Sequence, residues 1–236
     1  MKKFIVLTAL FLLATISYGQ SQQEWRDSLS VLSSMIEHNP RDVSLRLKKA
    51  AANIELGQWK YALDEYNAVL ELEPNNLNAL YYRGYVYQHL GRMTFARKDY
   101  EDILEKEPMN ANAMIGLIYV NSKDNRLGQA LYDANRFVEA YPHNAESYAV
   151  RADVEIALNM IDAALEDIEK AIKIEDVDAK RKYPYSIDDN ITTYQLTAFA
   201  LYMQKQQKGK AKAALDYLVE NGIPRGGLAD FYARLK

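Results

Sequence analysis

The stretch that decides the fold is residues 78–108, which read NALYYRGYVYQHLGRMTFARKDYEDILEKEP. Apolar residues recur at helical spacing until the chain meets Gly91, a residue that tolerates the left-handed backbone conformation that ends a helix. A second amphipathic pattern follows at once and stops before Pro108, because proline cannot continue a helix. The stretch therefore predicts two helices joined by a tight turn.

The same pattern recurs along the chain at a constant step. Four sets of positions keep this step: Pro40, Pro74, Pro108 and Pro142; Gly57, Gly91, Asn125 and Asn159; Ala62, Ala96, Ala130 and Ala164; Ala50, Gly84, Ile118 and Ala152. Prolines end the second helix of a unit, glycine or asparagine ends the first, and small residues let helices cross closely. Four sets in one register predict a stack of helical hairpins.

The unit resembles the tetratricopeptide repeat (TPR), a helix–turn–helix of about 34 residues. The resemblance is carried by 78–84, Leu90, Gly91, Ala96, Tyr100 and Pro108. It implies an all-α fold, a TPR-type α-solenoid whose hairpins wind into a right-handed superhelix. We place four units at 43–76, 77–110, 111–144 and 145–178. The fourth unit has Asp176 where the others have proline, and we expect its second helix to end there.

Residues 1–19 are typical of a secretory signal peptide. Two lysines precede a 13-residue apolar stretch, and Ser17 and Gly19 place small residues where a signal peptidase cuts. The apolar stretch is short for a membrane span, which needs about 20 residues. We therefore expect an exported protein, periplasmic or extracellular, without a membrane span after cleavage. The alternative is an uncleaved membrane anchor.

Two further segments flank the repeats. Residues 20–42 predict a capping helix that corresponds to the second helix of a partial repeat, with Trp25, Leu29, Leu32, Met35 and Ile36 on its apolar face. Solenoids need such caps because an end unit otherwise exposes its stacking face. Residues 179–236 predict an insertion loop at 179–189, then a divergent fifth hairpin and a C-terminal capping helix.

Composition narrows the possible functions. The chain has no cysteine, which excludes disulfides, thiolate catalysis and cysteine-bound metals. Its net charge is −3, and loss of the two leader lysines makes this −5, so we expect no nucleic-acid partner. The three histidines are too scattered in sequence to suggest a metal site, and we expect no metal and no cofactor.

The resemblance implies that the first helix of each unit lines a concave groove that binds a protein or peptide. Spacing along these helices predicts the groove-facing residues Asn78, Tyr81, Tyr85, Gln88, His89, Asn112, Tyr119, Ser122, Lys123, Glu146 and Asp153. Tyrosine offers rigid apolar area and a hydroxyl group, and asparagine and glutamine pair with peptide backbone. Packing against a neighbouring helix is the other interpretation of these tyrosines, and the one that we favour for Tyr66, Tyr87, Tyr100 and Tyr148.

No catalytic arrangement is recognisable, so we expect a non-enzymatic adaptor or scaffold. We expect Glu65, Glu71, Asp99 and Asp102 to form the solvated faces of second helices rather than a carboxylate pair. Some TPR proteins hold the C-terminal carboxylate of heat-shock chaperones with a basic clamp, which Leu47, Ala51, Tyr82, Asn112 and Gly116 replace here. Two alternatives stay open: a structural or self-associating subunit of a cell-envelope assembly, and a protein that binds glycans or small molecules.

Overall fold

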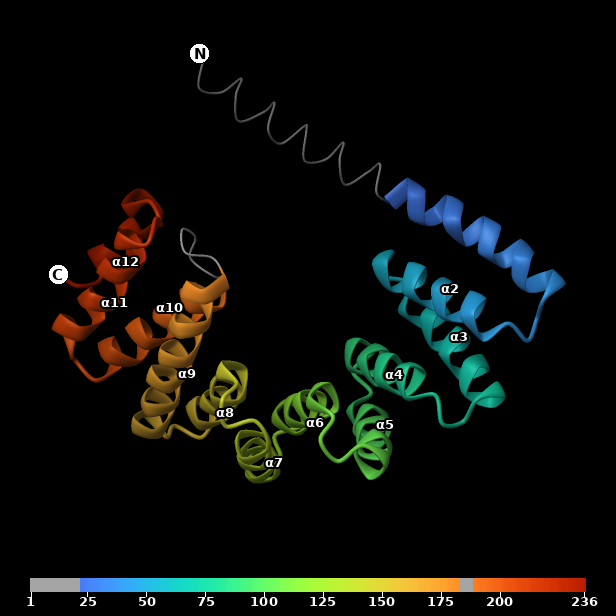
Figure 1. The fold of residues 1–236 in the computed structure, drawn as a ribbon, viewed down its shortest axis with the longest axis horizontal. Coiled ribbons are helices and arrows are strands. Elements are labelled where there is room, and N and C mark those ends of the chain that lie inside the picture. Colours follow the sequence, from blue (N-terminus) through green and yellow to red (C-terminus); the bar gives the residue numbers. More distant parts are fainter. Residues whose placement is uncertain (1–21, 183–188) are drawn as a thin grey trace, which may run out of the picture. The chain divides into compact units, whose positions relative to one another are not determined.

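The computed structural model describes residues 22–182 and 189–236, and Figure 1 shows helices throughout this part of the chain. Contacts divide the described chain into two compact units, one that ends at residue 116 and one that begins at residue 117. A helix over residues 22–38 comes first. It is followed by α2 (Val43–Glu55), α3 (Trp59–Leu72), α4 (Leu77–His89), α5 (Met93–Lys106), α6 (Ala111–Lys123), α7 (Leu127–Ala140), α8 (Ala145–Ala157), α9 (Ile161–Lys182), α10 (Asp189–Gln204), α11 (Lys208–Glu220), η1 (Arg225–Leu228) and α12 (Ala229–Ala233).

The predicted all-α, TPR-type fold is confirmed. Each hairpin pairs two consecutive helices, as α2 does with α3 and α4 with α5 in the first unit, and α8 with α9 and α10 with α11 in the second. The described residues contain no strand, and none of their helices is long and apolar enough to cross a membrane. The predicted leader, residues 1–19, lies outside the described part of the chain.

Local chemistry sets where the helices begin and end. Asp42 and its counterparts in the next two repeats, Asn76 and Asn110, each accept a hydrogen bond from a backbone N–H of the following helix, at 2.9–3.1 Å. Such caps satisfy one of the backbone donors left free at a helix start. At the turn between the paired helices, Asn125 and Asn159 take the left-handed conformation with φ of 55° and 59°, as Gly57 and Gly91 do in the earlier repeats. Asparagine tolerates this conformation better than most residues.

The small residues allow close packing, as predicted. Ala62 and Ala96 in the first unit, and Ala130 and Ala164 in the second, are completely buried. The ring of Tyr100 on α5 lies so close to Gly84 and Gly116 that a Cβ atom on either glycine would approach it within 2.9 and 2.6 Å. Glycine at these two positions therefore makes room for one large aromatic ring.

The expectation for two of the acidic residues was wrong. Asp99 is buried and forms two hydrogen bonds with the Arg83 guanidinium, at 2.7 and 2.9 Å. Glu65, which holds the position of Asp99 in the preceding repeat, forms ion pairs with Arg46 and Lys49 of α2. These carboxylates face the first helix of their own hairpin, where a basic side chain meets them.

The same contact recurs in the second unit and joins neighbouring hairpins. Arg151 on α8 holds Asp167 of α9 through two hydrogen bonds, at 2.6 and 2.7 Å, and a third hydrogen bond reaches Asn135 of α7 at 3.0 Å. In the first unit, Arg83 contacts Asn67 of α3 in the same way. One arginine thus makes hydrogen bonds to the helix before its own and to the helix after it. These bonds are strong because a planar guanidinium can pair both of its N–H groups with one carboxylate.

The C-terminal part differs from the prediction in one place. Helix α9 continues past Asp176 to Lys182, because aspartate lacks the ring with which proline stops a helix. Residues 179–182 and residue 189 of the predicted loop are thus helical, and residues 183–188 lie outside the described chain. Helices α10 and α11 form the expected fifth hairpin, and the ring of Phe231 from α12 packs edge-on against Phe199 of α10.

Candidate functional site

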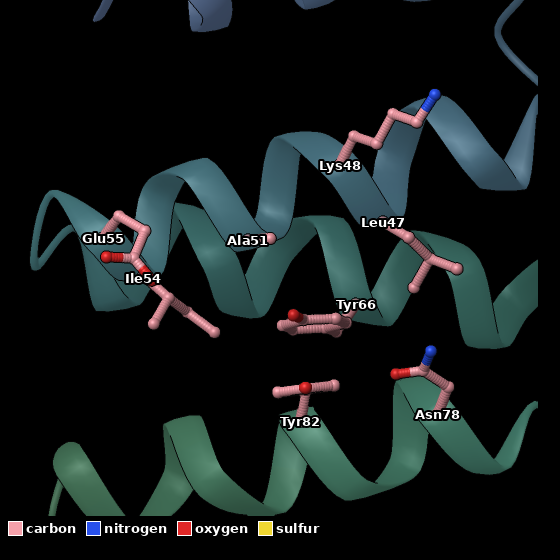
Figure 2. Close-up of a pocket in the computed structure, with 8 residues that line it drawn as sticks. All are labelled: Leu47, Lys48, Ala51, Ile54, Glu55, Tyr66, Asn78 and Tyr82. Atoms are coloured by element: carbon pink, nitrogen blue, oxygen red, sulfur yellow. The ribbon is translucent and has the colours of Figure 1, made fainter. Parts of the chain in front are cut away.

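Helices α2, α3 and α4 of the first unit line a partly open, largely apolar pocket of about 330 Å³. Its lining consists of Leu47, Lys48, Ala51, Ile54 and Glu55 from α2, Tyr66 from α3, and Asn78 and Tyr82 from α4. Figure 2 shows the rings of Tyr66 and Tyr82 lying face to face, with Leu47 and Asn78 to one side and Ile54 to the other. Lys48 extends away from the pocket at its rim.

The two stacked tyrosines form the aromatic wall of this pocket. Their ring centroids are 6.1 Å apart, with planes inclined by only 9°. Tyr66 is buried, whereas Tyr82 keeps 42% of its surface exposed and can therefore be reached by a ligand. Burial, followed by the effect of Tyr82, raises the pKa of Tyr66 far above its usual range, so its hydroxyl stays protonated. Aromatic side chains of this kind supply much of the affinity in protein interfaces.

The repeat step connects this pocket with the predicted groove. Leu47, Ile54 and Glu55 precede Tyr81, Gln88 and His89 by one repeat, so α2 uses the same positions that were predicted for α4. Asn78, the first residue of the prediction, is exposed and lines the pocket directly. The α2 residues were missed because the spacing was applied only to the second, third and fourth units. Subtracting one more step would have found them.

Two predicted residues on α4 contact the buried ring of Tyr100. Tyr81 is half-buried, with its ring centroid 6.0 Å from that of Tyr100 and 5.2 Å from that of Tyr82. The Gln88 Nε2 donates a hydrogen bond to the Tyr100 hydroxyl at 2.7 Å. Gln88 is thus held in place by the protein itself, and only its remaining amide groups are available to a ligand.

Two others form an aromatic cluster at the end of α4. The His89 ring stacks on Trp59 of α3 with a centroid distance of 3.9 Å and an angle of 4°. Tyr85 packs edge-on against both rings, at 4.5 Å from His89 and 6.1 Å from Trp59. His89 is exposed and Tyr85 is half-buried, so this cluster combines helix packing with an accessible surface. Asn112, the last predicted residue of the first unit, is exposed on α6.

The other predicted residues belong to the second unit, where their surroundings are more polar. Tyr119 is 45% exposed, and the Lys123 Nζ lies 5.3 Å from the centre of its ring. The Ser122 hydroxyl donates a hydrogen bond to the Ile118 carbonyl and is held on its own helix. Glu146 and Asp153 are exposed on α8.

The chemistry of the first-unit site suits non-covalent binding. It joins apolar and aromatic surface to the side-chain amide of Asn78 and to opposite charges on Lys48 and Glu55 at its edge. Among residues 22–182 and 189–236, no three His, Asp or Glu side chains come close enough to hold a metal ion.

Family models match two overlapping stretches of the chain. One family model, the TPR repeat, matches residues 51–91, and a second, the tetratricopeptide repeat, matches residues 78–108. No curated protein matches the chain by sequence.

Similar solved structures are found across most of the chain. A tetratricopeptide repeat protein from Parabacteroides merdae is 19% identical with a TM-score of 0.64, over 92% of this chain and 79% of that one. PilW, a type IV pilus biogenesis factor, is 14% identical with a TM-score of 0.68, over 87% and 89% of the two chains. YrrB, a TPR protein with an unusual peptide-binding site, is 21% identical with a TM-score of 0.53, over 81% and 92%.

These structural matches share the fold at low sequence identity. A stack of helical hairpins in one constant register defines the class of helical repeat proteins. Within that class, the matched family models show tetratricopeptide repeats over residues 51–108, and the similar structures share the TPR fold.

Proposed function

We propose that this protein is a non-enzymatic adaptor that binds a segment of another protein, and that the pocket between α2, α3 and α4 anchors that segment. The observation that carries the proposal is the exposed ring of Tyr82, stacked on Tyr66 at the wall of an apolar pocket. TPR folds serve protein interactions, and one similar structure, YrrB, is described as having a peptide-binding site.

The lining of the pocket indicates the chemistry of the ligand. A large apolar side chain fits between Leu47, Ile54 and the Tyr82 ring, where it removes apolar surface from water on both sides. The Asn78 amide, which both donates and accepts, suits the backbone of an extended peptide beside that side chain. The ligand is therefore an extended segment with an apolar anchor residue.

The binding site can be tested once a crosslinking pull-down from the native host has identified a partner. Replacing Tyr82 by alanine should raise the dissociation constant at least tenfold. Aromatic anchors that become buried in an interface contribute about 2 kcal/mol or more to the binding free energy. Leu47→Ala should weaken it in the same direction. Tyr61→Ala is the matched control, because Tyr61 is an exposed tyrosine on α3 that does not line the pocket. Unchanged affinity in both pocket variants, with helical content intact, would show that the partner binds elsewhere.

We also propose that the protein acts outside the cytoplasm, which rests on the leader-like sequence of residues 1–19. Expression in an exporting bacterial host should yield a chain that begins at Gln20 and is recovered without membrane extraction. The measurement is the intact mass of the purified protein. A product that retains the leader and sediments with membranes would contradict the proposal.

A further inference from the structure

Three of the hairpins share a basic–acidic pair, and the fifth hairpin lacks both of its members. The pairs join the first helix of a hairpin to the second: Lys49 with Glu65, Arg83 with Asp99, and Arg151 with Asp167. In each pair the basic residue stands eight positions before the left-handed residue of the turn, and the acidic residue eight positions after it. In the fifth hairpin the left-handed residue is Gln206, and the same count leads to Ala198 and Ala214.

Where this pair is missing, helices α9, α10 and α11 of the second unit line an open pocket of about 390 Å³. Ala198 and Ala214 both belong to its lining. Because an alanine side chain ends at Cβ, these residues do not fill the space that Arg151 and Asp167 fill in the preceding hairpin. The pocket therefore corresponds to the place of the missing pair.

Glu169 of α9 places a carboxylate at this pocket. It follows Asn135 by one repeat, and Asn135 accepts a hydrogen bond from the Arg151 guanidinium at 3.0 Å. Glu169 thus holds the position that contacts an arginine in the preceding repeat, with a negative charge in place of an amide. Its Oε1 accepts a hydrogen bond from the Tyr202 hydroxyl at 2.6 Å, and it forms no ion pair with residues 22–182 or 189–236. Its charge is therefore available to a cationic ligand.

Gln195 of α10 supplies a second polar group. It is only 7% exposed and lines the pocket, and within the described chain its side-chain amide makes no hydrogen bond. A buried amide without a partner costs free energy, which a ligand recovers when it pairs with that amide. Gln195 and Glu169 together offer oxygen acceptors to a donor-rich group inside the pocket.

We propose that this pocket binds an arginine side chain of a partner protein, whose guanidinium takes the place of the arginine that the fifth hairpin lacks. The planar guanidinium pairs with the Glu169 carboxylate and donates a further hydrogen bond to the Gln195 amide oxygen. The apolar stem of the arginine covers Ala198 and Ala214. The ligand of this site in the second unit is cationic, whereas the pocket of the first unit takes an apolar anchor.

Lys210 on α11 opposes a cationic ligand. Its Nζ lies 5.4 Å from the centre of the Tyr202 ring, and the residue is exposed. An exposed lysine can turn its ammonium group into solvent, where its repulsion is screened. Removal of this charge should therefore tighten binding, whereas removal of the charge of Glu169 should weaken it.

Titration of the isotope-labelled chain, purified from an exporting host, with N-acetylargininamide tests the proposal by NMR. The Gln195 side-chain amide and the backbone amides of Ala198 and Ala214 should shift in a saturable manner, with a dissociation constant of about 1 mM for a ligand of this size. N-acetylcitrullinamide, which has a similar shape and no charge, should bind at least about tenfold more weakly. Equal binding of the two compounds, or no saturable shift up to about 20 mM, would overturn the proposal.

A double variant closes the pocket without removing a packing contact. Ala198→Arg combined with Ala214→Asp restores the pair of the preceding hairpin. Its melting temperature should equal or exceed that of the wild type, and N-acetylargininamide should no longer shift its resonances. Undiminished binding by this variant, with the melting temperature maintained, would show that the compound binds elsewhere.

Two single variants test the charges and do not depend on the double variant. Glu169→Gln should raise the dissociation constant about fivefold, since glutamine still accepts from Tyr202 and carries no charge. Lys210→Gln should lower it about twofold. Glu166→Gln is the matched control, because Glu166 is exposed on α9 and does not line the pocket. The assignment fails if Glu169→Gln and Glu166→Gln bind the compound equally well.

Discussion

Replacing Glu155 by glutamine should stabilise the protein at alkaline pH and do little at acidic pH. Glu155 on α8 is only 6% exposed, and its Oε2 has no hydrogen-bond partner within the described chain. Burial, followed by the charge of Asp167, raises the pKa of Glu155 from 4.5 to about 7, against the attraction of Arg151. One repeat earlier, Asn121 occupies this position and its amide donates to Asp133 at 2.9 Å. A glutamine at 155 can make that contact at every pH.

The magnitude follows from linkage between protonation and folding. A pKa of about 7 in place of 4.5 means that ionised Glu155 costs the folded state about 3 kcal/mol. The stability that protonated Glu155 contributes is fully present below pH 4.5 and is lost as the pH rises through about 7. The variant's advantage in free energy of unfolding should therefore grow by about 2 kcal/mol between about pH 5 and about pH 8.

Urea denaturation followed by circular dichroism at both pH values measures this change. Glu146→Gln is the matched control, because Glu146 is exposed on the same helix and should shift stability by less than about 0.5 kcal/mol at either pH. An advantage of Glu155→Gln that is equal at the two pH values would refute the reasoning, since it would mean that Glu155 does not take up a proton on folding.

Four further substitutions test the turns and the packing of the repeats. Gln206→Gly should raise the free energy of unfolding by about 0.5–1 kcal/mol, because Gln206 holds a left-handed φ of 57° that glycine adopts without strain; a loss of stability in thermal denaturation would contradict this. Gly116→Ala should lower the free energy of unfolding by about 1–3 kcal/mol, since the new Cβ atom would lie 2.6 Å from the Tyr100 ring. Gly128→Ala, which has open space around it, should be neutral or stabilising in the same assay. Arg83→Met should cost about 3 kcal/mol or more by leaving a buried carboxylate without its cation, and full stability at neutral pH would argue against the ion pair.

Most of the fold could be predicted because each repeat carries its own local signals. Gly57 and Asn125 end helices through their backbone conformation, Ala62 permits a close crossing, and proline stops the second helix. These effects depend on residues near one another in sequence. The end of α9 was predicted wrongly because Asp176 stands where proline is expected, and aspartate does not stop a helix.

The binding pocket and the buried acids were harder to predict, because both arise from contacts between helices. Asp99 looks like a surface residue in sequence, and only the guanidinium of Arg83 across the hairpin explains its burial. Tyr82 follows a predicted groove residue but turns toward Tyr66, so one residue step along α4 changes the neighbour that it meets. Spacing places a residue on a helix and does not say which ring of the next helix it will touch.

The place of Tyr66 in both the core and the pocket has a consequence for how this protein can evolve or be redesigned. The ring is held among α2, α3 and α4 and at the same time forms part of the wall that a ligand would meet. A substitution of Tyr66 that changes the shape of the pocket wall therefore also disrupts the packing between the helices. New specificity is more accessible through Leu47 and Tyr82, whose exchange leaves the interior intact.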